Sequence, residues 1–141
     1  MTQYLDTSVL VAATANEGST GRIQAWLGAQ APEALAISDW VTTEFSAAFS
    51  IKLRTGQVDA AQRAEALAMF ARLSGESLTV LPVSRLHLRT AARFADQHAL
   101  GLRAGDALHL AICADHGATL CTLDRRLGEA GPALGVKTCL V

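Results

Sequence analysis

Short apolar runs alternate along the chain with longer segments in which apolar residues recur every three or four positions. The short runs have the length of buried strands, and the longer segments have the spacing of amphipathic helices. The pattern predicts strands at residues 2–6, 35–38, 78–83, 118–123 and 136–140. It predicts helices at residues 7–15, 19–29, 39–54, 59–73, 85–98 and 106–116, with one or two more helical turns at 124–130.

The regular alternation of strands and helices indicates the fold class. Strands that are separated by helices usually form a parallel sheet that is covered by helices on both faces. No repeat, linker or low-complexity segment divides the chain, and 141 residues are typical of one domain. We therefore predict a single α/β domain, residues 1–141, with a parallel sheet between two helical layers.

The composition sets limits on the core and on the cellular compartment. Half of the residues are hydrophobic and only 5% are aromatic, so Ala, Leu and Val must fill most of the core. No apolar run reaches the ~18 residues of a membrane span, and the N-terminus lacks the basic region of a signal peptide. The three cysteines, Cys113, Cys121 and Cys139, lack the spacing of a disulfide framework or a zinc site. We expect a cytoplasmic protein with reduced, buried thiols and no membrane partner.

The charges of the chain are nearly balanced. Twelve basic and 13 acidic residues give a net charge of −1 at pH 7, and the sequence pI is about 6.4. A basic excess, the usual mark of a nucleic-acid-binding domain, is missing. If four acidic residues gather in one pocket, nine remain against 12 basic residues, so the rest of the surface carries about three positive charges. Ten of the basic residues are arginines, which bind phosphate with two parallel hydrogen bonds.

Four acidic residues lie where the predicted elements would bring them to one edge of the sheet. Asp6 and Asp124 each follow a predicted strand, and Glu44 and Asp106 lie in the first turns of predicted helices. Ligands of open parallel sheets bind beyond the carboxyl ends of the strands, which is also where the helices begin. Close carboxylates repel one another unless a cation lies between them. Mg²⁺ and Mn²⁺ prefer oxygen ligands and can activate water against a phosphate ester, so the pattern predicts such a metal site.

Each of these acids also has a purely structural explanation. Asp6 and Asp124 could cap the helices that follow them. Glu44 could be an exposed helix residue, and Asp106 occupies a first turn, where acids are frequent. His109, one turn after Asp106, could donate a hydrogen bond to a ligand or act as a base, although a packed histidine is the commoner case.

Helical geometry separates the remaining acids from the candidate site. Asp115 follows Asp106 by nine residues, which places it on the opposite helix face at about 100° per residue. Asp39 lies about 140° from Glu44 by the same count, so it is a poorer candidate, and we expect Ser38 or Asp39 to cap the helix. Three further histidines are expected at the surface: His87, His98 and His116. Three arginines share one helix face that could contact RNA, an acidic partner or only solvent: Arg85, Arg89 and Arg93.

Several segments resemble, in the right order and over nearly the whole chain, the PIN domain and specifically the VapC-type ribonuclease toxins. The matching segments read YLDTSVLVA, ISDWVTTEFSAAF, AGDALHLAICADHGATLCTLDRRL and GVKTCLV. LDTS alone is a weak signal. The combination of DTSVL, TTEF, DALHLA and TLDRRL is specific, and it implies a metal-dependent endoribonuclease.

The resemblance also implies roles for individual residues. The four acids of the family fall on Asp6, Glu44, Asp106 and Asp124, which would act as catalytic residues and as ligands of Mg²⁺ or Mn²⁺. Ser8 and Thr122 match the hydroxyl residues that often lie beside those ligands. The family further implies a three-layer α/β/α domain with four or five parallel strands, a homodimer, an RNA substrate and a cognate antitoxin.

The helices at 39–54 and 59–73 offer a possible surface for such partners. They carry more Ala, Leu and Phe than one buried face needs. An amphipathic helix of an antitoxin could lie in a groove between them, and part of the same surface could close a twofold dimer.

Two other functions are compatible with the same acids. The first is a metal-dependent phosphohydrolase that acts on small phosphoesters. Its haloacid-dehalogenase type needs Asp-x-Asp near the first strand, whereas this chain reads LDTSV and lacks the second acid. The second is a catalytically idle PIN-like binding module, which predicts that one or more of the four acids is missing, and none is.

Overall fold

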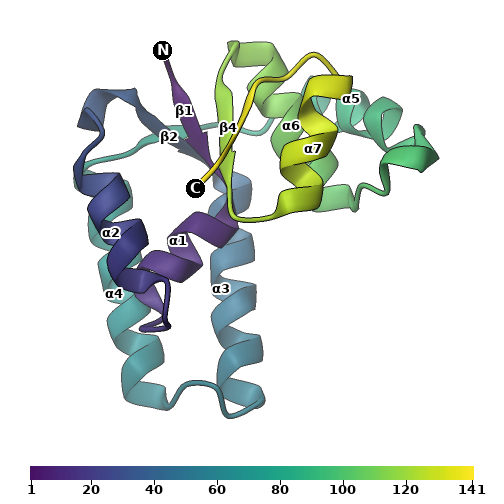
Figure 1. Ribbon diagram of the computed structural model, residues 1–141. Coiled ribbons are helices and arrows are strands. Elements are labelled where there is room, and N and C mark those ends of the chain that lie inside the picture. Colours follow the sequence, from purple (N-terminus) through teal and green to yellow (C-terminus); the bar gives the residue numbers. More distant parts are fainter.

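The computed structural model describes residues 1–141 and contains five strands and seven α-helices (Figure 1). The strands are β1 (Gln3–Leu5), β2 (Leu35–Ser38), β3 (Thr79–Leu81), β4 (Thr119–Thr122) and β5 (Thr138–Leu140). The helices are α1 (Thr7–Thr14), α2 (Thr20–Gly28), α3 (Asp39–Arg54), α4 (Ala60–Glu76), α5 (Arg85–Ala95), α6 (Ala104–His116) and α7 (Arg125–Ala133). Every predicted strand and helix is therefore present.

Some element boundaries differ from the prediction for local reasons. Helix α6 begins two residues before Asp106, so this residue lies inside the first turn instead of opening the helix. Helix α5 ends at Ala95, and a separate 3₁₀ turn covers His98–Leu100 before Gly101 reverses the chain with a φ of +62°. Helix α7 extends to Ala133 and is longer than the one or two turns expected.

All five strands are parallel, and their order is β3-β2-β1-β4-β5. The chain moves from the central strand β1 out to β3 and then crosses back to β4 on the other side of β1. Right-handed crossovers in opposite directions place helices on both faces of the sheet. Helices α1 to α4 accordingly pack together away from α5 to α7, which confirms the predicted three-layer α/β/α fold (Figure 1).

The chain connections leave β1 towards β2 on one side, and the chain later returns to β4 on the other side. In open parallel sheets, ligands bind at the carboxyl ends of two such strands. Leu5 of β1 is paired with Cys121 of β4, so the two strands end side by side. Asp6 follows β1 directly, and its amide donates a hydrogen bond to the carbonyl of Cys121. The residues after Thr122 leave β4 at the same edge.

The core is mostly aliphatic, with one aromatic cluster between α3 and α4. The rings of Phe45 and Phe70 stack with centroids 4.2 Å apart, and the Phe49 ring lies 4.9 Å from that of Phe45. Tyr4 and Leu5 of β1 are fully buried in the middle of the sheet. This packing fixes the strands whose ends carry the candidate site.

The prediction of three buried thiols is wrong for one cysteine. Cys113 and Cys121 are buried and unpaired, but Cys139 is exposed because it lies on the edge strand β5. None of the helices combines the length and the apolar character that a membrane span requires.

Candidate metal centre

Asp6 is held rigidly at the carboxyl end of β1. Its Oδ1 accepts a hydrogen bond from Ser8 Oγ at 2.5 Å, and its Oδ2 accepts one from Thr122 Oγ1 at 2.6 Å. The side chain is only 5% exposed, and burial raises the pKa of Asp6 above its ordinary value of 3.8 although both hydroxyls lower it. The carboxylate is therefore fixed in place with its charge poorly compensated.

The two hydroxyls that hold Asp6 also hold the segment after β4. Ser8 Oγ accepts the amide of Leu123 at 3.1 Å, and Thr122 Oγ1 accepts the amide of Asp124 at 2.9 Å. A hydroxyl can donate and accept at once, which is why Ser and Thr suit these two positions. Ser8 and Thr122 thus connect the first and the fourth acid of the predicted site.

Asp124 caps a helix, as its structural explanation predicts, and still keeps one carboxylate oxygen without a hydrogen bond. Its Oδ1 accepts the amides of Arg126 at 3.0 Å and Leu127 at 3.3 Å, so it caps α7. No hydrogen bond engages its Oδ2, and the residue is exposed. Capping and metal binding are therefore compatible roles for this carboxylate.

Glu44 lies in the second turn of α3, and two donors share one of its oxygens. Oε1 accepts hydrogen bonds from Thr7 Oγ1 at 2.6 Å and from His109 Nε2 at 2.5 Å. Burial alone raises the pKa of Glu44, but the hydrogen bond and charge of His109, followed by the Thr7 hydroxyl and the Trp40 indole, bring it below its ordinary value of 4.5. The lowered pKa favours the ionised carboxylate, and the hydrogen bonds from Thr7 and His109 hold the side chain in one position. Glu44 is therefore not a freely exposed helix acid.

Asp106 occupies the first turn of α6, where it accepts the backbone amide of Arg103 at 3.2 Å. Burial raises the pKa of Asp106 above its ordinary value of 3.8, against the effect of that amide. The charges of Asp124 and Glu44 raise it further. Asp124 and Glu44 are thus within electrostatic range of Asp106.

The structure nevertheless brings the carboxylates less close than the sequence predicted. No three of Asp6, Glu44, Asp106 and Asp124 have ligand atoms within 4.8 Å of one another. Mutual repulsion explains the separation, because each carboxylate instead takes hydrogen bonds from its own neighbours. The donor set fits a hard divalent cation, since it consists of carboxylate oxygens. The raised pKa values of Asp6 and Asp106 also show that the protein's own groups leave negative charge there uncompensated.

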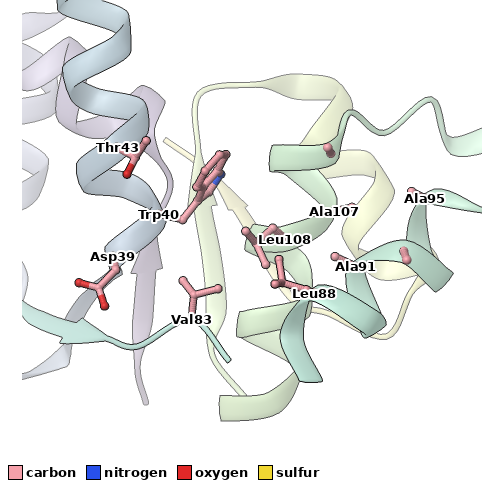
Figure 2. A pocket seen from close by; sticks show the side chains of 11 residues that line it. Asp39, Trp40, Thr43, Val83, Leu88, Ala91, Ala95, Ala107 and Leu108 are labelled. Atoms are coloured by element: carbon pink, nitrogen blue, oxygen red, sulfur yellow. The ribbon is translucent and has the colours of Figure 1, made fainter. Parts of the chain in front are cut away.

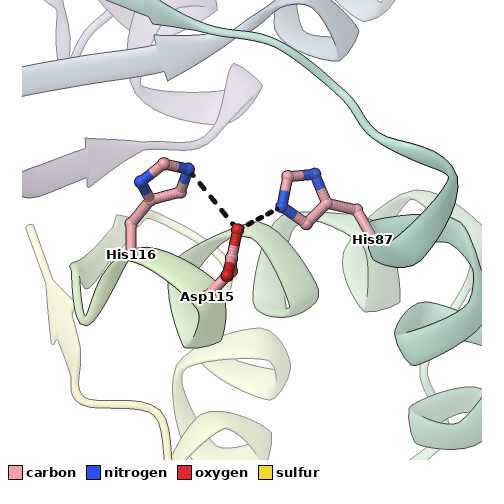
Figure 3. A group of neighbouring side chains, drawn as sticks. All are labelled: His87, Asp115 and His116. Carbon is pink, nitrogen blue, oxygen red and sulfur yellow. Dashed lines mark hydrogen bonds and ion pairs between the residues drawn. The ribbon is translucent and has the colours of Figure 1, made fainter.

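The group of ligand atoms that does lie within 4.8 Å is formed by His87, Asp115 and His116, away from this edge (Figure 3). His87 Nδ1 accepts the amide of Ser84 at 3.0 Å, so the proton of the neutral ring lies on Nε2. That nitrogen donates to Asp115 Oδ2 at 2.8 Å and has no lone pair for a metal. The group is therefore a hydrogen-bonded contact between α5 and α6.

This contact shows that the prediction for His87 was wrong and agrees with the prediction for Asp115. His87 is 5% exposed and not a surface residue, because it completes the capping box of α5 and reaches across to α6. His98 and His116 are exposed as expected. Asp115 contacts α5 and takes no part in the edge that carries Asp106, as the helical geometry predicted.

An apolar hollow of ≈ 510 Å³ lies beside the candidate site, between the first turn of α3 and helices α5 and α6 (Figure 2). Of the two residues predicted as possible caps of α3, Ser38 is the N-cap residue and Asp39 lines this hollow. Trp40 lines it too, and its buried indole Nε1 has no hydrogen-bond partner. Trp40 and Glu44 both approach Gly105, where a Cβ atom would lie 2.7 Å from Glu44 Oε2 and 3.2 Å from Trp40 Nε1.

Sequence reasoning did not find Trp40 or Gly105, because a tryptophan next to a helix start and a glycine in a helix are ordinary local features. It considered His109 but favoured a packed histidine, whereas the ring contacts Glu44 directly. The order Gly105-Asp106 was the one available signal, since a glycine in a first helical turn often marks a close approach.

The model of the PIN domain matches residues 3–131, which is most of the chain. The chain belongs to the PIN domain family. This match explains the segments that resembled the PIN domain in the sequence. Asp6 and Asp124 of this PIN domain follow β1 and β4, the two strands at which the strand order reverses. No curated protein sequence matches the chain.

Solved structures share the fold at low sequence identity. FitAcB from Neisseria gonorrhoeae is 19% identical, with a TM-score of 0.72 over 96% of this chain and 95% of that chain. VapC20 from Mycobacterium tuberculosis, described as a sarcin-ricin loop cleaving toxin, is 20% identical, with a TM-score of 0.73 over 92% and 95%. VapBC-5 from Mycobacterium tuberculosis, a member of the VapBC family of toxin-antitoxin systems, is 21% identical, with a TM-score of 0.66 over 99% and 98%.

Proposed function

We propose that this PIN domain is a metal-dependent endoribonuclease and the toxin of a type II toxin–antitoxin pair. The observation that carries the proposal is the set of acids at the switch between β1 and β4, in which Asp6 and Asp124 are tied together by two hydroxyls. The similarity to a sarcin-ricin loop cleaving toxin supports RNA as the substrate. The unpaired cysteines suit the reducing cytoplasm.

In this proposal Asp6, Glu44, Asp106 and Asp124 hold Mg²⁺ or Mn²⁺. Such an ion, when bound, neutralises charge on the scissile phosphate and lowers the pKa of the attacking water. Ser8 and Thr122 keep both oxygens of Asp6 in one orientation. The protein thus contributes preset oxygen ligands, with Asp124 keeping one oxygen without a hydrogen bond and Glu44 keeping one oxygen that neither Thr7 nor His109 engages.

The arginines favour RNA over a small phosphoester. The ion pairs of the chain involve Lys52 and three histidines, so all ten arginines are free of acidic partners. Three exposed arginines are sequence neighbours of the candidate ligands: Arg103, Arg125 and Arg126. Exposed guanidinium groups close in sequence to an acidic centre suit the successive phosphates of a nucleic acid. This arrangement compensates locally for the low overall pI.

Metal binding should stabilise the fold. A ligand that binds only the native state at 100 times its dissociation constant adds about 2.7 kcal/mol to the free energy of unfolding. We therefore expect the thermal midpoint to rise by several degrees between EDTA and excess Mn²⁺, as measured by circular dichroism. Cleavage of a structured RNA in Mn²⁺, without turnover of a chromogenic phosphoester, would identify the substrate class. Equal midpoints in EDTA and Mn²⁺ would contradict a metal centre.

We further propose that an antitoxin helix occupies an apolar hollow of ≈ 470 Å³ next to α4. The hollow is lined from α1, α2 and α4, with Leu10, Leu27 and Leu73 among its residues, and not by α3 and α4 as the sequence suggested. The reason is that α3 and α4 already fill the space between them with stacked phenylalanine rings.

We propose a homodimer that covers α5, where Leu86 is 65% exposed and Leu88 is 55% exposed. Light scattering of the purified chain should report the mass of two chains. The double variant Leu86→Lys, Leu88→Lys should be monomeric, because charged side chains oppose burial of that face. A wild-type chain that is monomeric at micromolar concentration would refute the dimer.

A further inference from the structure

A buried chain of hydrogen bonds runs from the centre of the sheet to Glu44. Ser38 Oγ lies 2.7 Å from the Tyr4 hydroxyl, which lies 2.7 Å from His109 Nδ1. The other ring nitrogen, Nε2, lies 2.5 Å from Glu44 Oε1. Ser38 and Tyr4 are fully buried and His109 is 2% exposed, so the chain is shielded from water.

The chemistry of the four groups fixes the orientation of the imidazole ring. An ionised carboxylate can only accept hydrogen bonds. Nε2 of His109 therefore carries the hydrogen and donates a hydrogen bond to Glu44. Nδ1 faces a hydroxyl that can donate or accept, so it is satisfied in either protonation state of the ring. Tyr4 is anchored in the central strand, and the ring is therefore held at both nitrogens.

The hydrogen bonds to Glu44 leave its two oxygens in different surroundings. Oε1 takes both donors, Thr7 Oγ1 and His109 Nε2. Oε2 lies over Gly105, next to Asp106 in the first turn of α6, and the Trp40 indole Nε1 approaches the same position. The pair of donors on Oε1 thereby directs Oε2 towards the other candidate ligands.

We propose that His109 is a positioning residue that orients Glu44 for metal binding through the Ser38–Tyr4–His109 chain. The inference rests on the proposed function, because it assigns the metal-binding oxygen within the same site. Partners that orient metal ligands typically change metal affinity or activity 10- to 100-fold when they are replaced. A histidine that serves only packing would change stability without a separate change in metal affinity.

Two substitutions of His109 distinguish the contribution of its Nε2 contact with Glu44 from that of its Nδ1 contact with Tyr4. The amide of His109→Asn is as far from the backbone as Nδ1, so it keeps a partner for Tyr4 and loses the donor to Glu44. The amide nitrogen of His109→Gln is about as far out as Nε2, so it keeps that donor and loses the Tyr4 contact. Both variants replace the buried ring by an amide, and Asn leaves more empty space than Gln because it is one methylene shorter. The thermal midpoint in EDTA reports this packing loss separately from Mn²⁺ affinity.

The experiment measures Mn²⁺ dissociation constants by calorimetry, thermal midpoints in EDTA, and RNA cleavage as a function of Mn²⁺. We expect His109→Asn, which loses the donor to Glu44, to bind Mn²⁺ about tenfold more weakly than the wild type. His109→Gln keeps that donor and loses only the Tyr4 anchor, so we expect a smaller loss of Mn²⁺ affinity. The Mn²⁺ concentration for half-maximal cleavage should rise with the dissociation constant.

Unchanged Mn²⁺ affinity in His109→Asn overturns the inference while leaving the proposed function intact, and so does an equal loss in both variants. A wild-type chain that neither binds Mn²⁺ nor cleaves RNA refutes the proposed function itself. If His109→Asn does not fold, Tyr4→Phe serves instead, because it keeps the ring and removes its anchor. Weaker Mn²⁺ binding in Tyr4→Phe supports the inference, and wild-type binding overturns it.

Discussion

The variant Asp106→Asn is expected to lose RNA cleavage and to keep the stability of the metal-free protein or slightly exceed it. Asparagine has the shape of aspartate, and its amide oxygen can still accept the Arg103 amide that Asp106 accepts. Cleavage is lost because the metal loses a charged ligand. Stability is kept because burial and the charges of Asp124 and Glu44 disfavour the ionised form of Asp106. Cleavage rates in Mn²⁺ and thermal midpoints in EDTA test both parts.

The stability difference between this variant and the wild type should depend on pH. The pKa of Asp106 is raised in the folded state above its ordinary value of 3.8. Its contribution to stability is therefore fully present below 3.8 and is lost as the pH rises through the folded-state pKa. The advantage of Asp106→Asn in EDTA should grow over that range. Glu44 acts in the opposite direction, since its lowered pKa gives stability that is lost as the pH falls below its ordinary 4.5.

Asp115→Asn is the matched control on the same helix. The amide oxygen of asparagine can still accept the hydrogen bond from His87 Nε2, so the contact between α5 and α6 remains. We expect cleavage close to that of the wild type. If Asp106→Asn cleaves normally and Asp115→Asn does not, the active face of α6 is the other one.

Gly105→Ala should impair the candidate site without harming the fold. The added methyl group would lie 2.7 Å from Glu44 Oε2 and 3.2 Å from Trp40 Nε1, both at the ends of movable side chains. The helix itself loses nothing, because Gly105 does not have a positive φ and alanine is a better helix former than glycine. We expect Mn²⁺ binding and RNA cleavage to fall about tenfold or more, as for other changes next to metal ligands. Thermal midpoints in EDTA should be equal to those of the wild type or higher.

Gly75→Ala provides the control for this substitution. Gly75 lies in α4, and no atom lies within 4 Å of the position of an added Cβ. The variant should gain the same helix preference and leave metal binding unchanged. Wild-type Mn²⁺ affinity in Gly105→Ala would show that the position of Glu44 next to α6 is unimportant.

The sequence predicted the parts of the site that depend on chain order. Asp6 and Asp124 stand out because each follows a short apolar run, and parallel strands that end at one edge bring such residues together. Glu44 was different, because its assignment among apolar neighbours rested largely on the resemblance to PIN domains. Its hydrogen-bond donors Thr7 and His109 lie 37 and 65 positions away in the sequence, so no local pattern contains them.

The remaining differences arise from tertiary contacts. His87 was assigned to the surface because a histidine in an arginine-rich helix is usually exposed, and its partner Asp115 lies 28 positions later. The spacing of the carboxylates could not be predicted either. It results from a balance between repulsion and hydrogen bonds that exists only once the side chains are placed.

The central position of β1 has a consequence for the synthesis of this protein. One of the two hydroxyls that fix Asp6 belongs to Thr122, 116 positions later, and β1 pairs with β4 on one side. A ribosome makes the N-terminal half first, so the nascent chain displays Asp6 and Glu44 long before Thr122 and Asp124 exist. An incomplete chain thus lacks the second contact that orients its first acid, together with two of the four acids. In the proposed function, the nuclease cannot be active until translation is nearly finished.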